Sequence, residues 1–417
     1  MDGTTVQPGL DTPVHAWPPG LTRVPYWVYQ DQTTARHEQT RIFQGPVWNF
    51  LCLEVDIPNP GDYRTTFVGD MPVVVARGDN GAIHAFENRC AHRGALICLE
   101  NAGTAKDFAC VYHAWRYDLA GNLCSVAFRH GVNGQGGMPA EFDMAAIGPR
   151  KLRTTIFCGL VFGTLSAATP PIEAFLGDAI AGRIRRVLKK PVEVIGRFTQ
   201  PLPNNWKLYV ENVKDTYHAS LLHLFFATFR ITRLSQGGGI LVSESGAHHA
   251  STTLAPAQAP DTTYRDAGLR SDSENFRLAD PSLLEIRDEW GDGIQLQILT
   301  VFPGFVLQQI HNCLAVRQVV PRGVDGMDLH WSYLGFADDT PDLRALRLKQ
   351  CNLVGPAGFV SMEDGCVGGF VQRGTAAAED EESVVEMGGS GAETQATRAT
   401  EAAVRGFWKE WRRLMEV

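Results

Sequence analysis

The stretch Asn88–Glu100, NRCAHRGALICLE, places Cys90 and His92 one residue apart. Cys110 and His113 follow in CVYHAWRYD, so the four side chains form the pattern Cys-x-His-x17-Cys-x2-His. Two thiolates and two imidazoles on two short loops can hold either a tetrahedral zinc ion or a [2Fe-2S] cluster with mixed ligands. The one-residue gap favours the cluster, because structural zinc loops usually leave two or more residues between paired ligands. Each loop could then give its cysteine to one iron and its histidine to the other.

The segments around these loops predict a small all-β domain. They are short and β-prone, with Gly, Asn and Asp turns between them: MPVVVARG (71–78), AIHAFEN (82–88) and KDFACVYHAWRYDLAGNL (106–123). His84 lies in this region but outside the pattern, and we interpret it as a structural histidine. The other seven cysteines, Cys52, Cys98 and Cys158 among them, are interpreted as buried apolar residues rather than ligands.

The composition is that of a globular protein with two or three domains. The chain has 417 residues, of which 44% are hydrophobic and 20% charged. A net charge of −8 argues against nucleic acid or an anionic membrane surface as the main partner. Residues 1–20 show no secretory signal and no apolar run approaches the length of a membrane span, so we expect a cytoplasmic protein. Nine cysteines without regular spacing do not indicate a disulfide framework.

A second metal site is indicated downstream by Asp215, His218 and His223 in the segment 204–226. Two residues five apart on a regular α-helix differ by about 140° around the axis, so these histidines converge only at a bulge or a helix end. Unrelated helix histidines are the alternative. The stretch SMEDG (361–365) offers a carboxylate, and two histidines with one carboxylate form the facial triad of non-haem Fe(II) oxygenases. Asp364 is the predicted third ligand, and Glu363 is the weaker candidate.

Together these motifs resemble those of the large α subunit of Rieske non-haem iron ring-hydroxylating oxygenases. The likeness includes the HRG and YHAW flanks and extends from LTRVPYWVY (21–29) to RGFWKEW (405–411). The resemblance implies an α+β protein with a Rieske domain, a helix-grip catalytic domain of antiparallel sheet covered by helices, a [2Fe-2S] cluster and a mononuclear Fe(II). It also implies that Asp215 accepts hydrogen bonds from His218 and from His113 of a neighbouring subunit.

The resemblance has implications for partners as well. Such α subunits commonly pair with a small β subunit as α3β3. The glycine-rich stretch Gly131–Gly137 has the wrong spacing for a dinucleotide site, so electrons from NAD(P)H must come through a separate reductase, directly or through a ferredoxin. An electron-transfer protein without oxygenase activity is one alternative, and a monooxygenase or demethylase without a β subunit is another.

The chain divides into an N-terminal extension (1–45), a Rieske domain (46–165) and a catalytic domain (166–417). Residues 31–43 predict a helix in the extension. In the catalytic domain, partial period-two alternation predicts antiparallel strands within 293–302, 305–320 and 328–337, and helices are predicted within 341–358 and 397–415. The segment between Gly368 and Thr397 is predicted to be a surface loop and a candidate lid.

Two arginines suggest the substrate class. Arg317 lies among apolar residues of a predicted strand, where it needs either a structural acid or a ligand. Several segments resemble the branch of the family that oxidises aromatic carboxylates, most closely terephthalate oxygenases and then anthranilate and salicylate oxygenases. The resemblance to terephthalate oxygenases implies that Arg317 and Arg398 serve carboxylates, although Arg398 by itself would be interpreted as a solvated helix residue. We therefore expect cis-dihydroxylation of an aromatic acid with O2, with terephthalate as the first candidate and anthranilate or salicylate as alternatives.

Overall fold

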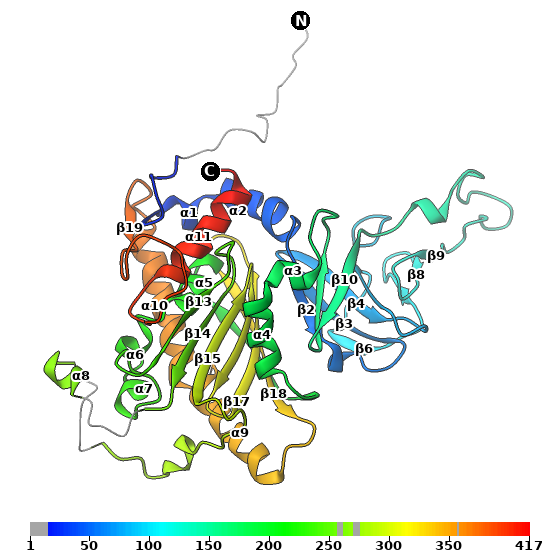
Figure 1. Cartoon of the computed structure of the whole chain (residues 1–417). Helices are drawn as coiled ribbons and strands as arrows, with labels where there is room; N and C mark the ends of the chain where they lie inside the picture. The colour runs from blue at the N-terminus through cyan, green and yellow to red at the C-terminus, as the bar shows by residue number, and fades with distance from the viewer. Residues whose placement is uncertain (1–15, 257–261, 270–275, 357) are drawn as a thin grey trace, which may run out of the picture.

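The computed structural model describes residues 16–256, 262–269, 276–356 and 358–417. Two antiparallel sheets of seven strands each form the frame of the molecule, one at the Rieske end and one at the catalytic end (Figure 1). The fold is therefore α+β, as predicted. The first part of the predicted N-terminal extension, residues 1–15, lies outside the described residues.

The Rieske end contains the first seven-stranded sheet and a small sheet of three strands. The larger sheet has the strand order β2 (Asn49–Leu53), β11 (Leu160–Thr164), β10 (Lys151–Phe157), β5 (Ile83–Glu87), β4 (Met71–Arg77), β3 (Asp62–Val68) and β6 (Ala102–Thr104). The small sheet consists of β7 (Phe108–Ala109), β8 (Arg116–Tyr117) and β9 (Leu123–Ser125). One predicted ligand loop joins β5 to β6 and the other joins β7 to β8, so the strands bring the two loops together.

The catalytic end is built on the second sheet. Its strand order is β12 (Val192–Leu202), β18 (Met327–Phe336), β17 (Cys313–Pro321), β16 (Phe305–Ile310), β15 (Ile294–Val301), β14 (His249–Leu254) and β13 (Gly238–Val242). Every neighbouring pair is antiparallel. The strands predicted within 293–302, 305–320 and 328–337 are all present, as β15, as β16 with β17, and as β18.

Most helices of the catalytic part cover one face of its sheet, the face arrangement that the sequence predicts, although α4 (Asp178–Val187) lies on the other. The first face carries α5 (Trp206–Lys214), α9 (Pro341–Val354), α10 (Phe359–Thr375) and α11 (Ala402–Met415) (Figure 1). The opposite face packs against α4 and against buried residues of β2 and β11, in a core that also includes α3 (Ile172–Leu176). Since the same apolar core includes strands of both sheets, the Rieske and catalytic parts are joined by packed side chains and not only by a linker.

The N-terminal segment is fastened to the catalytic part by a buried polar cluster. The helix predicted over 31–43 is present as α2 (Gln32–Glu38) followed by a π-helical turn (Gln39–Phe43), and it is preceded by α1 (Trp27–Gln30). At its end, the Glu38 carboxylate accepts hydrogen bonds from the indoles of Trp206 and Trp411, at 2.8 and 2.9 Å, and lies 2.7 Å from Lys207 Nζ. Glu38 therefore connects the N-terminal segment to α5 and α11.

Two predictions for the C-terminal region need correction. The helix predicted within 397–415 begins only at Ala402, and Arg398 lies in a bend before it. The segment between Gly368 and Thr397 is not a free loop: α10 continues to Thr375, and β19 (Glu382–Val384) pairs with β1 (Arg23–Pro25). Gln395 also forms a bridge with Ile240 of β13. These contacts hold the segment against the body of the protein and do not support a lid.

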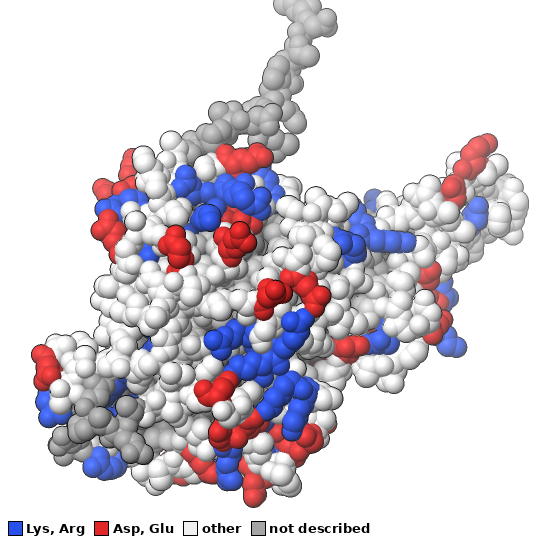
Figure 2. All heavy atoms as spheres, viewed as in Figure 1, with Lys and Arg blue, Asp and Glu red and all other residues white. Residues whose placement is uncertain are grey.

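Basic and acidic side chains are interspersed on the face shown in Figure 2. A band of Lys and Arg follows α4 there, but Arg185 pairs with Glu173 and Arg186 with Asp292. This band is therefore largely neutralised by neighbouring acids. None of the described helices is long and apolar enough to cross a membrane.

Candidate metal centres and substrate cavity

The two predicted cluster loops have the same backbone hydrogen-bond pattern. Gly94 N–H donates to Cys90 O at 2.9 Å, and Ala114 N–H donates to Cys110 O at 2.9 Å. The amide of each cysteine in turn donates to the carbonyl five residues later, on Ala95 and Trp115. Gly94 and Ala114 both have positive φ, 77° and 53°. Each loop thus folds into a turn that is closed on the backbone of its own cysteine and that contains the histidine.

The side chains of these loops are arranged with sulfur inside and imidazole outside. Cys90 and Cys110 are each 2% exposed, whereas His92 is exposed and His113 partly so. The two imidazole centroids lie 4.5 Å apart. The Tyr117 hydroxyl lies 3.2 Å from Cys90 Sγ and accepts a hydrogen bond from Ala91 N–H at 3.0 Å. Two buried thiols and two adjacent surface imidazoles fit the donor set of a [2Fe-2S] cluster with mixed ligands.

The second histidine pair lies at a break between two short helices. Helix α6 (Ala219–Leu222) begins immediately after His218, and α7 (Leu224–Thr228) begins immediately after His223. The backbone of His223, with φ −84° and ψ 82°, is not helical and separates α6 from α7. This is the helix end that the five-residue spacing required, and it allows both side chains to face the same point.

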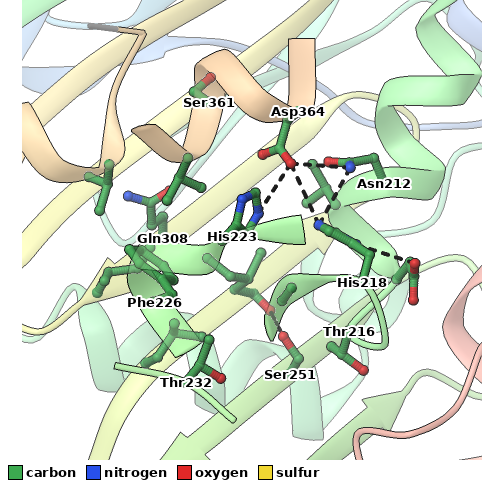
Figure 3. Close-up of a pocket in the computed structure, with 18 of the residues that line it drawn as sticks. Asn212, Thr216, His218, His223, Phe226, Thr232, Ser251, Gln308, Ser361 and Asp364 are labelled. Atoms are coloured by element: carbon green, nitrogen blue, oxygen red, sulfur yellow. Dashed lines mark hydrogen bonds and ion pairs between the residues drawn. The ribbon is translucent and has the colours of Figure 1, made fainter. Parts of the chain in front are cut away.

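His218, His223 and Asp364 converge at that point (Figure 3). Asp364 Oδ1 lies 3.3 Å from His223 Nε2 and 3.6 Å from His218 Nε2, and one ligand atom from each of the three residues lies within 4.8 Å of the others. Metal–ligand bonds of about 2.1 Å at right angles separate ligand atoms by about 3 Å. The three side chains therefore fit a mononuclear metal ion on one triangular face of its coordination sphere.

Carboxylates hold the far nitrogen of each ring. His218 Nδ1 lies 3.2 Å from Asp215 Oδ2, so the expected hydrogen bond between these residues is present. His223 Nδ1 lies 2.7 Å from Glu363 Oε2. Glu363, the weaker candidate for the third ligand, is thus on the Nδ1 side of His223, away from the point where the three other side chains meet.

The electrostatics of the triad suit a cation. Burial lowers the pKa of His218, but hydrogen bonds to Asp215 and Asp364 outweigh this effect and raise its pKa to about 10. Burial also lowers the pKa of His223, but hydrogen bonds to Asp364 and Glu363 outweigh this effect and raise it. Burial would raise the pKa of Asp364, yet the two imidazoles hold it well below the usual range. A metal ion that binds here must displace protons from the imidazoles, as imidazole ligation requires.

A cavity extends from this triad over the catalytic sheet. Its floor is formed by one face of β14 to β18, and its apolar lining includes Phe226, Leu296, Ile298, Ile310 and Trp331. Both predicted substrate arginines, Arg317 and Arg398, line the same cavity. Sequence positions separated by more than 180 residues are therefore brought to one chamber.

Comparison with known proteins places the chain in a family. Residues 47–133 match the Rieske [2Fe-2S] domain, and residues 189–417 match the catalytic domain of the ring-hydroxylating α subunits. The chain is a ring-hydroxylating oxygenase α subunit. It therefore uses a Rieske cluster and a mononuclear iron, as predicted.

Curated relatives are similar over nearly their whole length. The chain is 60% identical over 394 residues to subunit alpha 2 of the terminal oxygenase component of terephthalate 1,2-dioxygenase of Comamonas sp. The match covers 94% of this chain and 95% of the relative. The chain is 46% identical to the anthranilate 1,2-dioxygenase large subunit of Burkholderia cepacia, covering 94% and 93%. The naphthalene 1,2-dioxygenase of Rhodococcus sp. has the same fold, with a TM-score of 0.78, 23% identity and 94% coverage of both chains.

Sequence reasoning missed several residues of the α-subunit site. Asn212 Nδ2 lies 3.2 Å from Asp364 Oδ1, and Gln308 Oε1 accepts a hydrogen bond from Arg317. Asn212 precedes Asp215 by three residues, a spacing that places the two on neighbouring positions at the end of α5 and that could have been noticed. Gln308 and Tyr117 offered no such signal, because the partner of Gln308 lies on β17 and the partners of Tyr117 lie on the loop between β5 and β6.

Proposed function

We propose that this α subunit cis-dihydroxylates an aromatic dicarboxylate, with terephthalate as the first candidate. The observation that carries the proposal is a pair of buried arginines in the cavity beside the triad, Arg317 and Arg398, which are 6% and 4% exposed. The 60% identity to a terephthalate 1,2-dioxygenase α subunit supports the same substrate.

Neither guanidinium has a carboxylate partner among the described residues. Arg317 donates to the Tyr209 hydroxyl at 2.7 Å and to Gln308, and it lies over the ring of Trp331 at 4.6 Å. A buried cation with only neutral partners is costly, and a ligand carboxylate offsets that cost.

Arg398 has equally neutral surroundings. It donates to Thr232 Oγ1 at 2.6 Å and to the carbonyl oxygens of Arg233 and Gln236. Burial lowers the pKa of Arg398 to about 10, which is consistent with a guanidinium without a nearby anion. Its position in a bend, and not on α11, brings it to the cavity wall.

The spacing of the two arginines favours carboxylates at opposite ends of one ring. Arg317 is on β17, and Thr232, which accepts from Arg398, is within 3.2 Å of Thr253 on β14. Three strand spacings, or about 14 Å, separate β17 from β14. The apolar side chains of β15 and β16 between them can pack against the ring and hold its edge toward the triad.

We assign the metal ligands on the geometry described above. Cys90, His92, Cys110 and His113 would hold the [2Fe-2S] cluster, and His218, His223 and Asp364 would hold the mononuclear iron. When bound, the mononuclear iron supplies the site where dioxygen is reduced and its atoms are transferred to the ring. The protein side chains orient the ring, keep the imidazole nitrogens directed at the metal and exclude bulk water.

Asp215 is the proposed link between the two centres of neighbouring subunits. Its side chain is 23% exposed, so it can reach His113 of the partner subunit while it accepts a hydrogen bond from its own His218. A ring of three α subunits would repeat this contact at every interface. We further propose a small β subunit in an α3β3 assembly, and an NAD(P)H-dependent reductase, with or without a ferredoxin, as electron source.

The domain division that we propose follows the sheets. Residues 46–165 include all strands from β2 to β11, residues 166–417 include the catalytic sheet and its helices, and residues 1–45 form the N-terminal extension. The iron ligands of each centre then belong to one domain.

A substrate panel tests the proposal. With a surrogate reductase, the parent protein should turn over terephthalate with a higher kcat/KM than anthranilate or salicylate. Arg317→Gln and Arg398→Gln should each lower kcat/KM for terephthalate about 10- to 150-fold, the equivalent of roughly 1.5–3 kcal/mol for a charged hydrogen bond. Monoacids should respond more to one substitution than to the other. Arg373→Gln, at an exposed position of α10, is the matched control and should leave kcat/KM unchanged.

The alternatives give different results. If the arginines are structural, both variants lose thermal stability and metal without a selective change between monoacids and diacids. If the parent protein ignores terephthalate and turns over an ortho-substituted benzoate, the dicarboxylate proposal is wrong and the anthranilate or salicylate assignment replaces it.

A further inference from the structure

Glu363 lies beside the proposed iron site but does not face the metal position. Its Oε2 is 2.7 Å from His223 Nδ1, while Asp364 Oδ1 is 3.3 Å from Nε2 of the same ring. Consecutive residues of a helix point about 100° apart, so neighbouring positions of α10 can reach opposite edges of one imidazole. The ring of His223 is therefore held between two successive carboxylates.

The two histidines are held in different ways. His218 is oriented within its own segment, by Asp215 three residues earlier. His223 lies at the helix break and has no carboxylate partner in its own segment. Among the described residues, Glu363 is the only hydrogen-bond partner of His223 Nδ1, and it comes from a helix 140 residues away in the sequence.

We infer that Glu363 is a positioning residue that fixes the ring of His223 and joins it to the helix carrying Asp364. A carboxylate at Nδ1 keeps the proton on that nitrogen and leaves the lone pair of Nε2 free for a metal ion. Glu363 would thus act for His223 as Asp215 acts for His218, without being a metal ligand. The inference rests on the proposed iron site.

The surroundings of Glu363 allow an experiment to distinguish positioning of His223 from a general contribution to stability. Its side chain is 28% exposed, and within the described part of the chain it makes no hydrogen bond or ion pair other than that to His223. Removing the carboxylate should therefore leave the melting temperature near that of the parent. Its effect should appear at the metal.

The experiment uses protein from which the mononuclear iron has been removed while the Rieske cluster is retained. Titration with Fe(II) should show affinity reduced about 10- to 100-fold in Glu363→Ala, the range for lost carboxylate support of a ligating histidine. Glu363→Gln should lose less, because its amide oxygen still accepts from Nδ1–H. Met362→Ala, an exposed neighbour on α10, is the matched control and should bind Fe(II) like the parent.

Turnover provides a second readout that a purely structural role would not change selectively. In Glu363→Ala, the product formed per O2 consumed should fall, while the KM for the aromatic acid and the melting temperature stay near those of the parent. A freely rotating His223 ring explains this combination, since the substrate arginines are untouched.

Two results would overturn the inference. Parent-like Fe(II) affinity and coupling in Glu363→Ala would remove the positioning role, and complete loss of iron, equal to that of Asp364→Ala, would make Glu363 a ligand. Asp364→Ala separates this failure from a failure of the iron site itself. If Asp364→Ala retains iron, the proposed triad is wrong; if it loses iron while Glu363→Ala binds normally, only the role of Glu363 is wrong.

Discussion

The two candidate metal centres differ in how their ligands are supplied and how far they are exposed. The proposed Rieske ligands come from one stretch, Cys90 to His113, and their imidazoles lie at the surface. The mononuclear ligands come from two helical regions, and His223 and Asp364 are 4% and 8% exposed in their side chains. A centre that only passes electrons needs an imidazole edge that a partner can approach. A centre that binds substrate needs a closed cavity, in which charges interact strongly.

The two centres also differ in the carboxylates that surround their imidazoles. At the mononuclear centre, Asp215 and Glu363 occupy the outer nitrogens of the two imidazoles. At the Rieske centre, no carboxylate within the described residues is hydrogen-bonded to His92 or His113. This leaves the outer nitrogens of the Rieske imidazoles available to a partner, and it makes the link from His113 to Asp215 of another subunit possible.

The largest effect is expected from removing the anionic ligand of the buried centre. Asp364→Ala should lose the mononuclear iron and all measurable turnover, because the remaining imidazoles lack the charge that holds Fe(II). The Rieske absorption spectrum should be unchanged, since the proposed cluster ligands lie in the other proposed domain. Iron analysis should then give two irons per chain where the parent has three. Asp380→Ala, an exposed acid in a turn, is the control, and an altered Rieske spectrum in Asp364→Ala would contradict the independence of the centres.

This contrast explains how much the sequence could predict. The Rieske domain could be predicted because ligands within a short segment keep a fixed spacing, and the strands around them are close in sequence. The spacing of His218 and His223 even required the helix end that the structure contains. The sequence favoured Asp364 over Glu363 as the third ligand, but it could not show that the two carboxylates reach opposite nitrogens of His223, since that depends on how α10 is rotated against this histidine.

The bend at Arg398 was missed for a related physical reason. Local propensity extends the C-terminal helix back to residue 397, but the Arg398 guanidinium is bonded to Thr232 and to carbonyls on a distant loop. Tertiary contacts of this kind override propensity. For the same reason, the β19 pairing with β1 could not be read from the acidic, glycine-rich segment that contains it.

The next largest effect concerns the carboxylate that would connect the centres. Asp215→Asn should lower turnover at least about 100-fold with both metals still bound, because the amide weakens the hydrogen bonds without removing a ligand. Stopped-flow measurement should show normal reduction of the Rieske cluster and slow oxidation of it by substrate and O2. Near-parent turnover would exclude Asp215 from the electron path.

Replacing an exposed imidazole by a thiolate tests the Rieske assignment. His92→Cys and His113→Cys should lower the reduction potential by hundreds of millivolts, in the direction of all-cysteine clusters. The additional negative charge stabilises the oxidised state, and the electron paramagnetic resonance g-values should change with it. A variant that keeps the parent potential and g-values would show that the replaced histidine is not a ligand.

A smaller shift is expected from the hydroxyl that contacts the buried sulfur. The Tyr117 hydroxyl, 3.2 Å from Cys90 Sγ, should favour the reduced cluster, which carries more negative charge. Tyr117→Phe removes this hydroxyl. A difference of about 1 kcal/mol in hydrogen-bond strength between the two redox states corresponds to roughly 40 mV, so the potential should fall by that order. Tyr112→Phe, at an exposed position of the loop between β7 and β8, should leave the potential unchanged. A rise of the potential in Tyr117→Phe would contradict this role.

The smallest effect is expected from exchanging glycine and alanine at the equivalent positions of the two Rieske turns. Gly94 and Ala114 occupy the same place in the two turns, each with positive φ, and only glycine adopts that conformation without a steric cost. A left-handed alanine costs roughly 1 kcal/mol, and the extra freedom of glycine in the unfolded chain offsets part of it. Ala114→Gly should therefore retain its cluster to a temperature about 1–2 °C higher, and Gly94→Ala should lose it earlier. Among the described residues other than its chain neighbours, no atom lies within 4 Å of a Cβ placed at Gly94, so the expected effect there comes from the backbone angle. Visible absorption of the cluster during heating measures both changes, and equal effects of the same sign in the two variants would show that the turns are not equivalent.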